Sequence, residues 1–209
     1  EADEAIKMDQ LDQLLAPMAT RIVTDLELDF SSFRMKNSGL LAGTYGEGVS
    51  TWAEVATAGA VMSANGVPKD DGWCYAVNPY TQTSLAGDQR SLGADASLER
   101  SAHERATITN NFAGMRVMEA TTLSSITSTA LTDRAGVIGS VDVTYLTAKD
   151  TMTQSIAITG LEAQVNTIPA GSVVQVTGKY RNNLSTRQAV VDGAQANVLW
   201  TGVVTADAD

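Results

Sequence analysis

Residues 71–123 constrain the fold of this chain more than any other stretch of its sequence. An apolar run at 73–77, typical of a buried strand, stops at Asn78-Pro79. A helical pattern follows at 94–107, and Ala113-Gly114 then leads into a second strand candidate at 115–120. The stretch therefore predicts a strand, a stop, a helix, a tight turn and another strand. None of these residues forms a catalytic constellation, so the stretch favours a structural protein over an enzyme.

The first 36 residues carry one apolar stripe with a period of 3.6 residues, which predicts an amphipathic helix over residues 1–36. Arg21 and Asp25, on another face, are spaced for a weak ion pair. Pro17 either kinks one long helix or lies in the first turn of a second one. The stripe is cleanest after Pro17, so we favour a start near Ala16, which gives a helix about 30 Å long. The stripe consists of Leu11, Leu14, Leu15, Met18, Ile22, Leu26, Phe30 and Phe33.

A glycine-rich segment at 37–50 separates this helix from the next. It lacks the Gly-Lys-Ser/Thr ending of a phosphate loop and follows no buried strand, so we expect a surface loop. Thr51 and Glu54 then have the spacing of a capping box, and Asn65-Gly66 has the chemistry of a helix end. A helix of about 14 residues is therefore predicted between them.

After about residue 136 the helical periodicity disappears, and Thr, Val, Ile and Gly dominate. Such segments are typical of short strands. A turn at 168–171 leads into one of them. The remainder of the chain, residues 136–209, is predicted to be a small all-β module attached to an α+β body. The strand candidates cover 141–145, 155–158, 172–176 and 197–201.

Composition narrows the function classes. The 209 residues suffice for one or two domains with a real core, and 44% hydrophobic with 18% charged residues fits a globular chain. The formal charge is −10 and Lys and Arg form no cluster, which argues against sequence-specific DNA binding. No apolar run is long enough for a membrane span, and no export leader is recognisable. We therefore expect no membrane partner.

The residues able to carry chemistry are few. Cys74, the only cysteine, has no internal disulfide partner, and its place in an apolar run predicts a small core residue. His103, the only histidine, lacks a second histidine four residues on, so we expect a solvent-facing helix residue. The acceptor pattern Asn183-Leu184-Ser185 is interpreted as chance without an export signal. The sequence predicts no catalytic, cofactor-binding or metal-ligating residue.

The order of these elements resembles the major capsid (coat) protein of tailed bacteriophages, which has the Hong Kong 97-type fold. Within that family the chain looks most like the coat proteins of short-tailed phages of the P-twenty-two type. Four segments carry the resemblance: the amphipathic helix at 17–37, the helix and strand at 52–79, the helix and return strand at 94–117, and the β-rich stretch after residue 136.

The resemblance implies a mechanical function. Residues 1–36 would be the spine helix of a peripheral domain, 37–135 an axial domain, and 136–209 an inserted β-rich domain. Copies would pack as hexamers and pentamers into an icosahedral head that encloses the DNA genome, helped by scaffolding and portal proteins. The protein would be made in the cytoplasm of a bacterial host and end in the virion. The resemblance implies no cofactor. An acidic coat protein also suits a shell that encloses DNA without binding its phosphates tightly.

The resemblance also implies an N-terminal arm and a return to the peripheral sheet, which this sequence does not show, so we expect a fragment of a longer polypeptide. Two alternatives compete with the capsid hypothesis. A secreted surface-adhesion or carbohydrate-binding β module with a helical stalk would present aromatic platforms, but only 5% of the residues are aromatic. A fragment of an α/β enzyme would need catalytic residues elsewhere.

Overall fold

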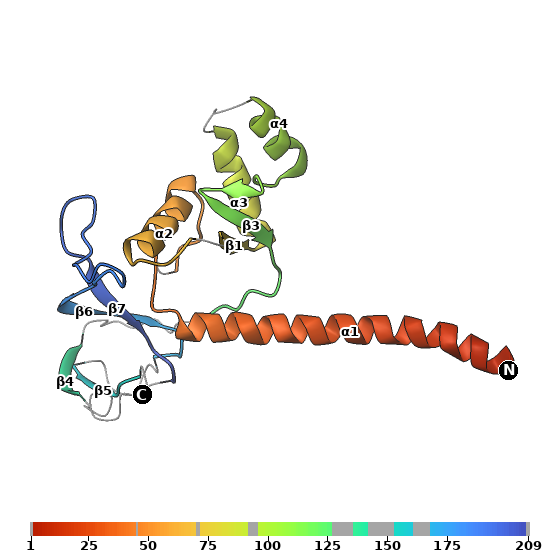
Figure 1. Ribbon diagram of the computed structural model, residues 1–209, viewed down its shortest axis with the longest axis horizontal. Coiled ribbons are helices and arrows are strands. Elements are labelled where there is room, and N and C mark those ends of the chain that lie inside the picture. The colour runs from red at the N-terminus through yellow and green to blue at the C-terminus, as the bar shows by residue number, and fades with distance from the viewer. Residues whose placement is uncertain are drawn as a thin grey trace.

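The computed structural model describes residues 2–44, 46–69, 72–91, 96–126, 136–141, 153–160 and 168–207. Its longest element, α1 (Ala2–Asn37), is one helix of 36 residues that projects from the rest of the chain as a rod (Figure 1). At 1.5 Å per residue it is about 54 Å long. The predicted helix at 1–36 is confirmed, but the start favoured near Ala16 is wrong, because the helix continues through Pro17. The proline removes one backbone hydrogen bond, whereas ending and restarting the helix would leave several unpaired groups at each new end.

The second helix, α2 (Trp52–Ala64), begins at the predicted capping box. The Thr51 hydroxyl accepts from the N–H of Glu54 at 3.4 Å, and the Glu54 carboxylate accepts from the N–H groups of Thr51 at 3.0 Å and Ser50 at 2.8 Å. Because these bonds favour the charged form, they lower the pKa of Glu54 below its ordinary value. The helix ends at Asn65-Gly66 as predicted, and Gly66 has a φ of +81°.

The strand β1 (Trp73–Val77) is present as predicted, and α3 (Pro79–Ser91) follows it almost at once. The Asn78 side-chain oxygen accepts from the N–H of Thr81 at 2.7 Å. Asn78 is therefore the cap of α3 and Pro79 occupies its first position, a combination that favours a helix start. Between the predicted strand and the predicted helix at 94–107, the chain thus forms a helix of 13 residues. The next helix, α4 (Ala96–Arg105), lies within the predicted 94–107.

Three strands form the sheet beside these helices. β1 pairs in parallel with β3 (Met115–Glu119), and the short β2 (Asn111–Phe112) pairs antiparallel with the other edge of β3. Ala113 and Gly114 connect β2 to β3 with φ values of 49° and 77°. Two successive left-handed residues make the two-residue hairpin turn that matches strand twist. The predicted turn is confirmed, and the backbone conformation explains the glycine.

One hydrophobic core lies between α2, α3, α4 and this sheet. At its centre Leu85 is fully buried. Trp73 and Tyr75 pack against the core from β1, but Cys74 between them is exposed, so the prediction of a core cysteine is wrong. Successive side chains of a strand point to opposite faces, and only one face of β1 meets the core. The buried members are Val55, Val77, Leu85, Ala86, Ala102, Ile108, Phe112 and Met115.

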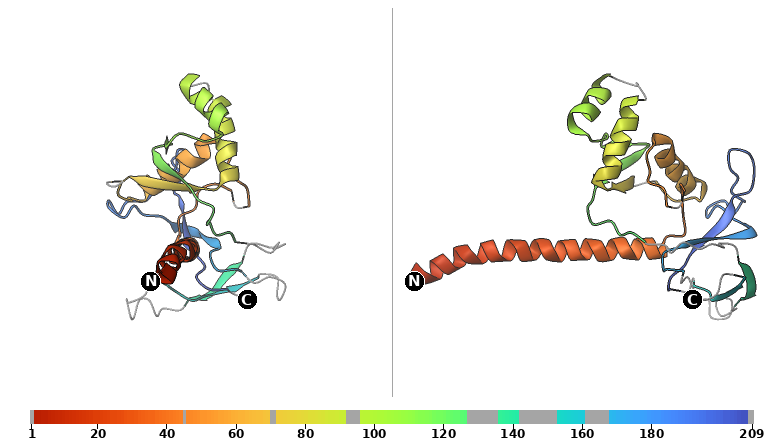
Figure 2. Two further views of the ribbon diagram at one scale, coloured as in Figure 1. Left: turned by 90° about the vertical axis from the view of Figure 1, so that its right-hand side faces the viewer. Right: turned by 180° about the vertical axis from the view of Figure 1, so that it is seen from behind.

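The described part of residues 136–209 contains strands and no helix. β4 (Val137–Val141) pairs antiparallel with β5 (Ile156–Thr159), and β6 (Val173–Tyr180) with β7 (Leu199–Val203). Three predicted strands are confirmed within a few residues at each end. The fourth, 141–145, meets β4 only at Val141, and 142–145 lie outside the described residues. The chain is therefore of the α+β class. Figure 2 shows β6 and β7 beside the end of α1.

Candidate functional site

The residues singled out for chemistry do not converge. His103 is exposed on α4, as predicted, and Cys74 is exposed on β1. Among the described residues no group of three or more His, Cys, Asp or Glu side chains could hold a metal ion. The adjacent residues Asp70 and Asp71, which the sequence places in a polar turn typical of solvated carboxylates, lie outside the described residues. The catalytic residues of an enzyme would have to come together, and the described side chains of these types are scattered.

No helix in the described part of the chain combines the length and apolar character needed to cross a membrane.

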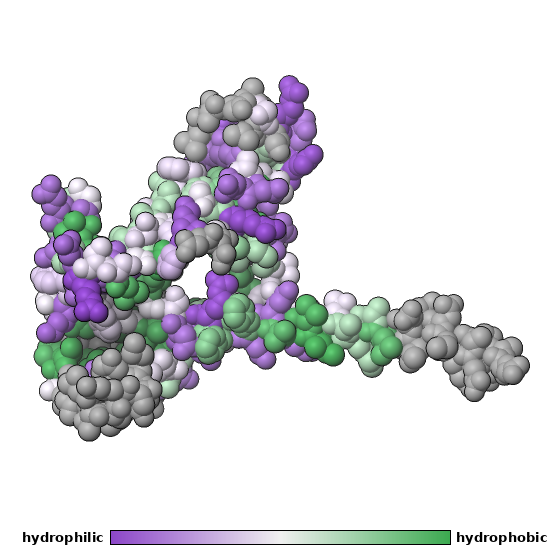
Figure 3. All heavy atoms as spheres, in the orientation of Figure 1, coloured by the Kyte–Doolittle hydropathy of each residue, from purple (hydrophilic) through white to green (hydrophobic). Residues whose placement is uncertain are grey.

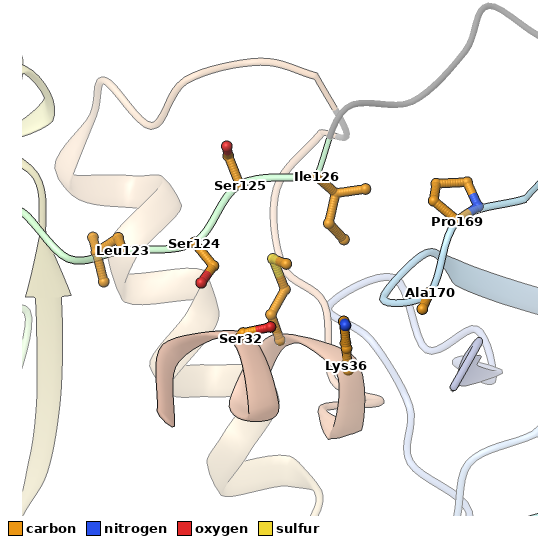
Figure 4. Close-up of a pocket in the computed structure, with 9 residues that line it drawn as sticks. Ser32, Lys36, Leu123, Ser124, Ser125, Ile126, Pro169 and Ala170 are labelled. Carbon is orange, nitrogen blue, oxygen red and sulfur yellow. The ribbon is translucent and has the colours of Figure 1, made fainter. Parts of the chain in front are cut away.

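An open hollow of about 520 Å³ lies at the end of α1 (Figure 4). Ser32 and Lys36 of α1 line one side, residues 123–126 pass over it, and Pro169 and Ala170 close the far edge. Its wall combines serine hydroxyls with apolar side chains, and Lys36 is the charged residue among those that line it. Among the described residues, no hydrogen bond or ion pair joins Lys36 to a serine of this lining.

The most unusual surface is the apolar stripe of α1, because its described members are exposed. Ile22 and Leu26 are each 68% exposed, and Figure 3 shows green spheres along the rod where it leaves the body. Exposed apolar patches of this kind mark sites of contact with other protein or with membrane. The described members of the stripe are Leu15, Met18, Ile22, Leu26, Phe30 and Phe33.

The polar side of α1, in contrast, contacts its own chain. The Ser31 hydroxyl accepts from the N–H of Ser124 at 2.8 Å, and the Glu27 carboxylate accepts from the Thr122 hydroxyl at 3.2 Å. At 100° per residue, Glu27 and Ser31 stand more than about 130° round the helix from Ile22. The helix is therefore held by its polar side, with its apolar stripe turned outward.

A second contact region joins three segments that are far apart in sequence. Just after β6, Arg181 is 8% exposed, and its guanidinium donates to the backbone oxygen of Gly39 at 2.8 Å and to the side-chain oxygen of Asn65 at 3.3 Å. Thr201 of β7 donates its hydroxyl to the same Gly39 oxygen. Burial lowers the pKa of the Arg181 guanidinium. We call this region the α1–α2–β6 junction.

Nothing in the sequence pointed to this junction. Arg181 is one of 14 basic residues and stands in no motif. Asn183, interpreted as part of a chance glycosylation pattern, donates its side-chain N–H to the Ala64 oxygen at 2.8 Å, and its own side-chain oxygen accepts from the N–H groups of Ser185 and Thr186. The sequence can indicate that a polar residue lies at a turn. That the same side chain also contacts a distant segment is seen only in the folded structure.

A long projecting helix with an outward apolar stripe, beside small sheets, is the geometry of a protein that contacts other protein. A comparison with known families identifies the kind. Residues 1–207 match the family described as P22 coat protein, gene protein 5. The chain belongs to this family.

A search of curated proteins gave a relative named "Major capsid protein" from Acyrthosiphon pisum secondary endosymbiont phage 1. The two are 30% identical over 195 residues, which cover 93% of this chain and 46% of the relative. The chain therefore spans about half the length of the curated relative it matches. The predicted resemblance to phage coat proteins is confirmed.

Proposed function

We propose that the chain is part of a major capsid subunit, whose copies assemble into the icosahedral head of a tailed bacteriophage. The observation that carries this proposal is the outward apolar stripe of α1, beside membership in a coat protein family. Burying one large aliphatic side chain contributes roughly 1.5–3 kcal/mol. Burial of the six described residues of the stripe would strongly favour association with the protein surface that covers them. In a shell, the same contact forms once per subunit.

The finer assignments belong to the same proposal. The fold would be of the Hong Kong 97 type, with α1 as the spine helix, residues 37–135 as the axial domain and 136–209 as the inserted β domain. Two observations support this division: the hydrophobic core draws all its buried members from residues 55–115, and the described residues after 136 hold only strands. Hexamers and pentamers, with scaffolding and portal proteins as partners, complete the proposal.

The sequence left two alternatives open, a fragment of an α/β enzyme and an adhesion module. The family match supports neither of them. The family match covers the chain from residue 1 to 207, so it includes both the helical and the β-rich parts. A polypeptide that works mechanically needs no catalytic cluster, and the charge of −10 suits an enclosure for DNA that does not bind phosphate tightly.

The experiment is expression of the full-length gene in bacteria together with its neighbouring phage genes, followed by sedimentation and negative-stain microscopy. We expect closed shells of uniform diameter that contain the protein as their main component. A product that stays in small soluble species under these conditions, or that copurifies with a hydrolytic activity on a broad substrate screen, would overturn the proposal.

A further inference from the structure

The α1–α2–β6 junction is built around one guanidinium group. Arg181 reaches Gly39, two residues beyond the end of α1, and Asn65, the C-terminal cap of α2. The two acceptors belong to different segments, so the planar fork of an arginine can join them while the single ammonium of a lysine cannot do so with the same geometry. Both of these acceptors are neutral oxygens.

The end of α2 also accepts donors from the loop that follows β6. The last carbonyl groups of a helix have no partner within it and carry partial negative charge. Two of the oxygens here are paired across the junction: Ala64 accepts from the Asn183 side chain at 2.8 Å, and Asn65 accepts from the N–H of Leu184 at 3.1 Å. The loop thus serves as an external cap, and the positive Arg181 is added at the negative end of the helix dipole.

The contact is close as well as polar. A Cβ placed on Gly66 would stand 2.9 Å from the Asn183 side-chain oxygen and 3.1 Å from the Ser185 hydroxyl. With a φ of +81°, Gly66 is also in a conformation that other residues adopt at a cost. The β6 loop and the end of α2 therefore fit each other without room for another side chain.

We propose that Arg181 is a positioning residue that locks the β6–β7 pair onto the end of α2 and the exit of α1, so that the three segments move as one body. The proposal rests on the proposed function in one respect: a subunit needs this fixed angle between its α and β parts to close a shell. The shell-closing step and the docking itself are tested separately below.

Overall stability is a poor readout for this role. Removing a buried arginine relieves the cost of desolvating its charge but leaves its acceptor oxygens short of a donor, and these two effects on the free energy of unfolding oppose each other. A residue that merely fills space would change the melting temperature and leave the junction intact. A positioning residue would instead change local opening at the junction, which hydrogen exchange measures amide by amide.

The first experiment compares Arg181→Met with Lys179→Met in the full-length protein. Lys179 is exposed on β6, so its variant removes the same charge from the same region without touching the junction. In Arg181→Met we expect the Leu184 amide to exchange at least about tenfold faster, since hydrogen bonds from a charged group are lost at the contact. Amides paired between β6 and β7, such as that of Val176, should keep their rates, as should the whole of Lys179→Met.

Two further variants keep the test decisive where Arg181→Met folds poorly. Arg181→Lys retains the charge but not the fork, and we expect the Leu184 amide to open at a rate between wild type and the Met variant. Asn183→Ala removes the bond to Ala64 and should open the same amide. Combined with Arg181→Met it should add less than the sum of the two effects, because both act on one contact.

Shell formation is scored for the same variants. We expect Arg181→Met to reduce the fraction of closed shells about tenfold relative to Lys179→Met, with open or irregular products instead. Unchanged exchange at Leu184 in Arg181→Met would overturn the docking role. Faster exchange with normal shells would overturn the link to closure. If wild-type protein forms no shells, the proposed function fails, and the exchange rates alone still decide the docking role.

Discussion

Leu85 in α3 and Ile22 in α1 are both large aliphatic residues in helices, but the first is fully buried and the second is 68% exposed. The region from α2 to β3 folds its apolar side chains around one core, whereas α1 turns its apolar stripe away from its own chain. The comparison shows that the same residue types complete the fold in one region and leave it open to contact in the other. Substitutions should therefore act on stability in the core and on assembly in α1.

The largest effect is expected from Ile22→Gln combined with Leu26→Gln. Glutamine is a good helix former, so α1 should persist, while two side chains at roughly 2 kcal/mol each are lost from the covered surface. We expect about 4 kcal/mol less favourable assembly, or nearly a thousandfold, measured as the protein concentration at which shells form.

The matched control for that variant is Leu28→Gln, which stands about 160° round the helix from Leu26 at 100° per residue. It repeats, off the stripe, the change made by Leu26→Gln alone, the single variant with which it is compared, so shells should form nearly as in wild type. Equal loss in both variants would show that the stripe has no special role.

Leu85→Ala should act on the other side of the comparison. Removing a fully buried leucine side chain leaves a cavity and lowers the free energy of unfolding by about 3 kcal/mol. Chemical denaturation followed by tryptophan fluorescence measures it, because Trp73 packs against this core. Leu184→Ala, at a residue 78% exposed, should change stability by less than about 0.5 kcal/mol.

Asn78→Ala sharpens the comparison at the level of one helix start. The variant removes the acceptor for the N–H of Thr81 and should lower stability by about 1 kcal/mol. Asn78→Asp keeps an acceptor and should remain close to wild type. If Asn78 caps the helix, the thermal midpoint should fall in Asn78→Ala and stay near wild type in Asn78→Asp. If Asn78 only ended the strand, the two variants would have the same thermal midpoint.

The smallest effect concerns Glu54, whose lowered pKa makes its contribution depend on pH. A carboxyl group with a depressed folded-state pKa stabilises above its ordinary value of 4.5, and this contribution is lost as pH falls through the lowered pKa. We expect the amides at the start of α2 to lose protection in acid. Glu54→Gln keeps an acceptor but does not titrate, so its protection should not change over the same acid range. A wild type without acid sensitivity would contradict this account.

Local chemistry made much of the core region predictable. The capping box at Thr51 and Glu54, the stop at Asn65-Gly66 and the turn at Ala113-Gly114 involve neighbours within a few residues, so their meaning does not depend on the rest of the fold. Asn78-Pro79 was predicted to end a strand, but its second role, the start of α3, was not predicted. Cys74 was predicted wrongly, because an apolar run does not reveal which face of a strand meets the core.

The sequence by itself determined the long amphipathic helix, the α-to-β change near residue 136 and the likeness to phage coat proteins, since each is a pattern along the chain. Only the tertiary structure decided that the apolar stripe of α1 faces outward and that Arg181 joins Gly39 to Asn65. Periodicity shows that a helix has an apolar side, but which side is covered depends on partners 93 and 95 residues away along the chain. Contacts at that separation leave no mark in local spacing.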